Sequence, residues 1–147
     1  MRYYSTAVLL LCCTLFSTAL FLSAPASPAH AFPADTAGQA VVEEAYTWIG
    51  TPYGAYGADC SGFTSQVFAS FGVYLPDHPA TQWSYGVPST AEAGDLVFYD
   101  EHGYGISHVG IATGYGTVIH SSTYYGAVVE TPMYAIPGYV GARDVLY

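Results

Sequence analysis

The chain has 147 residues, a length that indicates one small domain with its own buried core. Eleven acidic side chains against two basic ones give a formal net charge of −9. Nucleic-acid phosphates need basic contacts, so this composition argues against nucleic-acid binding. It also argues against electrostatic adsorption to anionic lipids or anionic wall polymers.

Residues 1–31 have the pattern of a secretory signal peptide. An almost wholly apolar run over 7–22 is followed by small residues that end in an A-x-A site at Ala31. We expect cleavage there, a mature domain of residues 32–147, and a protein secreted to the cell wall. The alternative is a membrane anchor, but prolines follow the apolar run at once and no basic stop-transfer cluster is present, so we expect no stable anchor.

Two helices are predicted first. Residues 37–49 place apolar side chains at helical spacing, with acidic residues near the early turns. A glycine- and tyrosine-rich loop over 50–57 follows. Residues 61–71 carry a second apolar stripe of helical period, which Gly72 ends.

The rest of the chain is predicted to form an irregular segment followed by strands. Residues 75–88 contain three prolines and are predicted to form an irregular surface segment. The pattern then changes to that of strands, with candidates at 95–99, 108–113, 117–120, 127–130 and 142–146. Helices followed by strands predict an α+β domain, with the N-terminal helices packed on an antiparallel sheet.

Removal of the signal peptide leaves one cysteine, Cys60. A lone cysteine in an exported protein is a packed core thiol, an intermolecular link or a reactive group. Cys60 lies at the predicted start of the second helix, between Asp59 and Ser61. Polar neighbours argue against a core thiol, and a helix N-terminus favours a thiolate, so we expect a reactive cysteine with a pKa below the usual 8.5 or so.

Two histidines are placed to act on such a thiol. In the run HVGIATGYGTVIH, His108 begins one predicted strand and His120 ends the next, and their midpoint is Gly114. A hairpin turning there would set the two imidazoles opposite each other, so that one orients the other. Small residues on the face of His108 would leave room for the second helix. The alternative is a pair of unrelated histidines on a solvated edge. His78 and His102 lie in predicted loops and are expected at the surface.

A metal site is a further alternative for these side chains. Cys60, His108 and His120 could together supply three zinc ligands. However, no C-x-x-C or H-x-x-x-H spacing supports a metal site. We therefore predict a nucleophilic site with no metal and no cofactor.

In this order, the strings TPYGAYGADCSGF, LP, a glutamine, AGDLVFY and SHVGIATGYGTVIHSS resemble the NlpC/P60 family of cell-wall cysteine peptidases. The resemblance covers residues 37 to about 130. It implies a papain-like, circularly permuted α+β fold and a thiol protease acting on peptidoglycan. The implied substrate is a stem peptide, cleaved between D-glutamate, through its γ-carboxyl, and a diamino acid. We expect a monomer.

The resemblance also implies residue roles. It assigns Cys60 as nucleophile, His108 as base and His120 as the orienting third residue. It assigns Tyr53 to the oxyanion, and Asp59 and Ser61 to the amino end of the stem peptide. Asp95 matches a turn residue and is expected to be structural.

Two departures from the family pattern bear on the substrate. The loop between the tyrosine and the cysteine is short, and the family's basic residue after Leu-Pro is replaced by Asp77. The same fold could also serve an amidase or acyltransferase, an antibacterial toxin, or a non-catalytic wall-binding domain.

Overall fold

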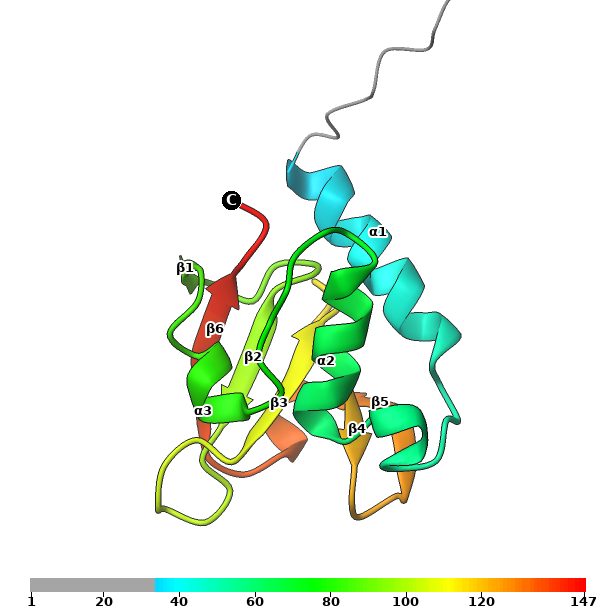
Figure 1. Ribbon diagram of the computed structural model, residues 1–147. Helices are drawn as coiled ribbons and strands as arrows, with labels where there is room; N and C mark the ends of the chain where they lie inside the picture. Colours follow the sequence, from blue (N-terminus) through cyan, green and yellow to red (C-terminus); the bar gives the residue numbers. More distant parts are fainter. Residues whose placement is uncertain (1–33) are drawn as a thin grey trace, which may run out of the picture. The chain divides into compact units, whose positions relative to one another are not determined.

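A computed structural model describes residues 34–147, and Figure 1 shows their arrangement. The predicted signal peptide and its cleavage site lie outside the described residues. The elements, in chain order, are α1 (Ala34–Thr47), a 3-10 turn (Ala55–Gly57), α2 (Cys60–Ala69), α3 (Pro79–Gln82), β1 (Val87–Ser89), β2 (Leu96–Tyr99), β3 (His108–Ala112), β4 (Thr117–Ser122), β5 (Ala127–Pro132), a second 3-10 turn (Met133–Ala135) and β6 (Tyr139–Asp144).

The six strands form one sheet in the order β1-β6-β2-β3-β4-β5, and every neighbouring pair is antiparallel. The helices α1 and α2 cover one face of this sheet (Figure 1). This confirms the predicted α+β class, with N-terminal helices on an antiparallel sheet. Among the residues from 34 onward, no helix is long and apolar enough to cross a membrane.

Apolar side chains fill both faces of the sheet. Strand residues alternate between the two faces because successive side chains of a strand point in opposite directions. The helix-covered face contributes Leu96, Phe98, Val109, Ile111 and Ile119 to a core shared with Val41, Ala45, Phe63, Val67 and Phe68 of the helices. The opposite face carries a smaller cluster that includes Val97, Tyr99, Ala112 and Val118.

The second helix begins where predicted but ends earlier. It begins at Cys60 and ends at Ala69, two residues before the predicted end. A turn then closes on Gly72, whose φ of +77° favours glycine. As a result Phe71 is 38% exposed and is not part of the core.

The segment 75–88 lies mostly at the surface, as predicted, but it is not wholly irregular. It contains α3 and the edge strand β1, which pairs with β6. Gln82 at the end of α3 is fully buried. Proline is compatible with both elements, because Pro79 lies at the start of a helix and Pro88 on an edge strand.

Candidate active site

The loop before α2 and the helix itself place Cys60. Asp59 caps the helix, since its Oδ1 accepts a hydrogen bond from the Gly62 amide at 2.8 Å. An added Cβ at Gly62 would lie 1.9 Å from the carbonyl oxygen of Gly57. Only glycine therefore allows the preceding loop to lie against the first turn of the helix. These contacts hold Cys60 at the first helical position.

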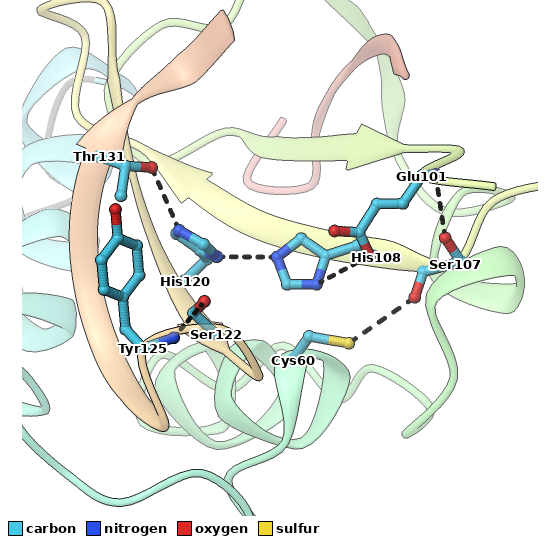
Figure 2. Close-up of polar contacts among 8 residues, drawn as sticks. All are labelled: Cys60, Glu101, Ser107, His108, His120, Ser122, Tyr125 and Thr131. Atoms are coloured by element: carbon cyan, nitrogen blue, oxygen red, sulfur yellow. Dashed lines mark hydrogen bonds and ion pairs between the residues drawn. The ribbon is translucent and has the colours of Figure 1, made fainter. Parts of the chain in front are cut away.

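The Cys60 thiol is buried, and it points toward the strand that begins with His108. The side chain is 8% exposed, and Sγ lies 4.0 Å from the carbonyl oxygen of Ser107 (Figure 2). Because Ser107 directly precedes His108, the helix start and the start of β3 meet at the thiol.

The pKa of Cys60 is raised, not lowered as its helix position predicted. Burial is the largest cause and the charge of Asp59 the second, and together they raise the pKa of the thiol to about 11. The backbone amides of Val109 and Ser61 act in the opposite direction. A helix N-terminus favours a thiolate only where burial and nearby carboxylates do not outweigh it. In the free protein the thiol therefore keeps its proton.

The two histidines form a direct hydrogen bond. His108 Nε2 and His120 Nδ1 are 2.8 Å apart, and the rings are nearly perpendicular. Both side chains are buried. The predicted contact is therefore present, but the predicted register is wrong.

β3 and β4 pair with Ile111 opposite Ile119 and Ala112 opposite Val118, so the hairpin turns one residue later than Gly114. The imidazoles therefore meet along a diagonal of the ladder and not directly across it.

Gly110 makes this diagonal contact possible. A Cβ on residue 110 would lie 2.6 Å from Val118 Cγ2 and 2.9 Å from the Cβ of His120. The space beside His108 is thus filled by β4.

The prediction that α2 would approach this face of the sheet is wrong, because α2 packs on the opposite face, with Val109 and Ile111. Cys60 instead lies at the end of the strand, where its Sγ is 4.0 Å from the carbonyl oxygen of Ser107.

The hydrogen-bond chain defines the roles of the ring nitrogens. His120 Nε2 lies 3.1 Å from the hydroxyl of Thr131 (Figure 2). If His108 is to accept a proton at Nδ1, its Nε2–H must donate to His120 Nδ1, and His120 Nε2–H must then donate to Thr131. Thr131 carried no signal in the sequence, because a single threonine on a strand resembles any other.

Burial keeps both histidines neutral. It lowers the pKa of His108 to about 3, with a further contribution from His120, and it lowers the pKa of His120 to about 4. His108 is therefore unprotonated across the whole neutral range. Burial thus disfavours both an isolated thiolate at Cys60 and an isolated imidazolium at His108.

Ser61 and Asp77 meet beside the thiol. Ser61 Oγ donates to Asp77 Oδ1 at 2.7 Å and lies 3.3 Å from Asp59 Oδ1. Asp77 is exposed, and this hydrogen bond ties its carboxylate to the start of α2.

Gln82 anchors the same region from within. Its amide nitrogen donates to the carbonyl oxygens of Ser61 and Pro76, and its amide oxygen accepts from Thr64.

Tyr53 lies at the exposed edge of the site. The side chain is 38% exposed, and its backbone amide donates to the carbonyl oxygen of Gly126. Burial first, and then the charge of Cys60, raise the pKa of the Tyr53 phenol. The structure therefore brings Tyr53 within electrostatic range of the thiol.

The remaining sequence predictions near the site concern three residues. His78 and His102 are exposed, as predicted. Asp95 is buried, and its Oδ2 accepts from the backbone amide of Glu92 at 2.7 Å, which confirms the structural role. Over residues 34–147, no group of three His, Cys, Asp or Glu side chains is arranged to hold a metal ion.

Glu101 was not identified from the sequence. It lies in the loop between β2 and β3, and its Oε2 is 4.0 Å from His108 Nδ1 (Figure 2). It borders a cavity of about 420 Å³ that both histidines, Thr131, Tyr124 and Tyr125 also line. A loop residue has no periodicity to reveal it, so no pattern pointed to Glu101.

Comparison with known proteins gives consistent matches. A model of the NlpC/P60 family matches residues 43–140. A probable endopeptidase of Corynebacterium glutamicum (strain R) is 44% identical over 113 residues, which cover 70% of this chain and 51% of that protein. A gamma-DL-glutamyl hydrolase of Bacillus subtilis (strain 168) is 39% identical over 98 residues, which cover 59% of this chain and 24% of the relative. The chain thus spans about half or less of the length of these curated relatives.

Comparison with solved structures points to the same family. The crystal structure of the NlpC/p60 domain of the peptidoglycan hydrolase SagA matches with a TM-score of 0.64 and 36% identity. The match covers 73% of this chain and 97% of that domain. The family model covers two thirds of the chain, and the solved domain agrees with it in fold. The chain therefore belongs to the NlpC/P60 family of cell-wall peptidases.

Proposed function

We propose that this protein is an exported cysteine endopeptidase that cleaves peptidoglycan stem peptides, with Cys60 as nucleophile, His108 as base and His120 as the residue that orients His108. The observation that carries the proposal is the 2.8 Å contact between the two imidazoles, at the strand end where the Cys60 thiol lies. The names of the relatives, which include endopeptidases and peptidoglycan hydrolases, support the same class of reaction.

The first step transfers a proton and forms a bond. His108 Nδ1 takes the proton from Cys60 Sγ as the sulfur attacks an amide carbonyl carbon. The positive charge on His108 is stabilised by its Nε2–H donor bond to His120 Nδ1. The backbone amide of Cys60 and the hydroxyl of Tyr53 are the groups assigned to stabilise the oxyanion.

The second half of the reaction reverses the proton transfer. His108 gives its proton to the leaving amine as the C–N bond breaks and a thioester to Cys60 forms. A water molecule then attacks the thioester carbonyl, and His108 accepts one of its protons. The peptide leaves as a carboxylate, and the thiol regains a proton.

One carboxylate and one hydroxyl suit the acyl side of the substrate. Asp59 and Ser61 lie beside the thiol, and their carboxylate and hydroxyl are able to hold the free amino end of a stem peptide. We place the cleaved bond between D-γ-glutamate and a diamino acid. The similarity to a gamma-DL-glutamyl hydrolase supports a γ-glutamyl bond.

Export is part of the proposal. The apolar run of residues 7–22 and the A-x-A site before residue 32 motivate it. N-terminal sequencing of the secreted protein should find a start at or near Phe32. Recovery of protein that still begins at Met1 would contradict this part.

Product analysis tests the reaction itself. Purified stem peptides are incubated with residues 32–147, and the products are identified by mass spectrometry. We expect two fragments, one ending in a γ-linked glutamate carboxylate and one beginning with the free amine of the diamino acid. Cys60→Ala should yield neither fragment while it keeps the circular dichroism spectrum of the wild type. Fragments that arise from another bond would reassign the specificity, and transfer to an added amine without hydrolysis would indicate an acyltransferase.

A further inference from the structure

The cavity beside the histidines has a defined place in the reaction. It holds about 420 Å³ and lies on the side of the site lined by His108 and His120. This size is in the range of pockets that hold small ligands. Because His108 protonates the leaving amine, the residue that carries this amine must lie on the histidine side of the site. The cavity is therefore the place for the diamino acid, an inference that rests on the proposed function.

One carboxylate borders this cavity, and its loop holds it in place. The Glu101 backbone amide donates to Ser107 Oγ at 3.1 Å. The carboxylate of Asp100 accepts from the backbone amides of Gly103, Tyr104 and Gly105, which closes the loop. The Glu101 side chain is 32% exposed, so an incoming group can reach it.

No lysine or arginine offsets the charge of Glu101, and burial keeps the imidazole of His108, 4.0 Å away, neutral. In the part of the chain that the structure describes, Arg143 is the sole lysine or arginine. Its guanidinium lies 4.1 Å from the centre of the Trp83 ring and does not line the cavity. The far wall carries the perpendicular pair Tyr124 and Tyr125, and the faces of such rings attract cations.

We propose that Glu101 is a specificity-determining residue that selects, on the leaving side of the bond, a diamino acid whose side chain ends in an ammonium group alone. The carboxylate of Glu101 attracts this ammonium. A diamino acid that carries a second carboxylate beside its terminal amine brings a negative charge to the same cavity, whose lining contains no lysine or arginine to receive it. Lysine is a diamino acid of the first kind, and diaminopimelate of the second.

Three matched substrates test the proposal. They are stem peptides with L-lysine, Nε-acetyl-L-lysine or meso-diaminopimelate at the diamino-acid position. For the wild type, we expect kcat/KM to be highest with lysine, by about fivefold over either of the others, the upper range for a partly exposed ion pair. The difference should lie mainly in KM, because Glu101 binds the side chain and not the reacting bond.

Variants of Glu101 separate recognition from folding. Glu101→Gln keeps the shape and the backbone bond to Ser107, so it should remove the preference for lysine. The ratio of kcat/KM between lysine and acetyl-lysine should fall to about one, whatever the change in absolute rate that follows from the loss of a carboxylate 4.0 Å from His108 Nδ1. Glu101→Lys should favour diaminopimelate over lysine. Glu43→Gln removes the same charge from an exposed position of α1 and should preserve the preference for lysine.

Two results would overturn the proposal. One is an equal loss of activity on all three peptides in Glu101→Gln, and the other is a wild type that cleaves them at equal rates. Cys60→Ala should cleave none of the three peptides. If the wild type also cleaves none of them, the result would contradict the proposed function and not only the role of Glu101.

Discussion

His108 and His120 are the same side chain in two different positions of the hydrogen-bond chain. Within residues 34–147, His108 Nδ1 has no hydrogen-bond partner closer than Glu101 Oε2 at 4.0 Å, whereas both nitrogens of His120 are engaged, one by His108 and one by Thr131. In the proposed mechanism, His108 therefore exchanges protons with the substrate, and His120 keeps the tautomer and the orientation of His108.

The two histidines should respond differently to substitution. We expect His108→Ala to lower kcat by about 10⁴-fold, because it removes the base. His120→Gln keeps an acceptor oxygen for His108 Nε2, so the loss should be about a hundredfold or less. Steady-state kinetics on a stem peptide measure both. Equal and complete loss in two folded variants would contradict this division of roles.

The buried thiol should label slowly at neutral pH. Burial and the charge of Asp59 raise the pKa of Cys60 to about 11, so little thiolate exists at pH 7 in the free protein. We expect the iodoacetamide alkylation rate to keep rising above pH 8.5, the midpoint region of an ordinary thiol. A rate that reaches its plateau below that pH would show that a thiolate–imidazolium pair exists before substrate binds.

The close approach of β3 and β4 at Gly110 sets the distance between the two imidazoles. In Gly110→Ala, the added methyl group would meet Val118 and His120, so β3 and β4 must move apart. We expect a loss of about 1–3 kcal/mol in the free energy of unfolding, and a larger relative loss of activity because the imidazoles separate. Gly116→Ala is the control, since a Cβ there meets open space and its φ of +80° strains only the turn. It should lower stability but not kcat per folded molecule.

Gln82 should contribute to the stability of the protein more than its position in a four-residue helix suggests, because it anchors the start of α2. Gln82→Met has a similar volume but leaves the Ser61 and Pro76 carbonyl oxygens without this donor. We expect the free energy of unfolding in urea to fall by about 2–4 kcal/mol, since buried polar groups lose their partners. Gln66→Met, at a partly buried position with one such bond, should cost less than about 1 kcal/mol. Similar losses in both variants would contradict the role of Gln82.

Prediction from the sequence succeeded where a periodic pattern existed. The apolar stripe of α2 and the alternation in β2 to β5 placed these elements within a few residues. β1 and α3 were missed because proline-rich segments have no periodicity. The hairpin register was wrong because turn conformation sets it, and a pattern of period two is unchanged by a shift of two residues.

The site was predictable in part for the same reason. The motif DCSGF placed Cys60 at a helix start, and the separation of His108 and His120 placed them on one face of a hairpin. The raised pKa of the thiol was not predictable, because it depends on burial by distant residues. Glu101 is placed in the site by the path of the loop between β2 and β3, and Thr131 by the pairing of β5 with β4. Only the folded structure shows these placements.

At the scale of the whole molecule, the neutral histidines make stability depend on pH. The unfolded chain protonates His108 and His120 near pH 6.5, whereas the folded pKa values are about 3 and about 4. Between these values the unfolded state binds more protons, so the free energy of unfolding falls as the pH drops below 6.5. Each histidine contributes a slope of about 1.4 kcal/mol per pH unit.

Urea unfolding between pH 7 and pH 5 measures this slope. Substitution of both His108 and His120 by glutamine should flatten the dependence of the free energy of unfolding on pH, whatever the absolute loss of stability. The double substitution His78→Gln and His102→Gln, at exposed positions, should leave it unchanged. A slope that persists without His108 and His120 would assign the effect to other groups.

Trapping the covalent intermediate tests the central claim most directly, which is that Cys60 attacks the peptide with help from His108. The protein is mixed with a stem peptide, quenched in acid within the first turnover, and its intact mass is measured. We expect the mass to increase by that of the acyl fragment, with the adduct on the tryptic or peptic fragment that contains Cys60, and we expect no adduct with Cys60→Ala. Cleavage of the peptide by Cys60→Ala, or turnover by the wild type without any adduct on Cys60, would contradict the account.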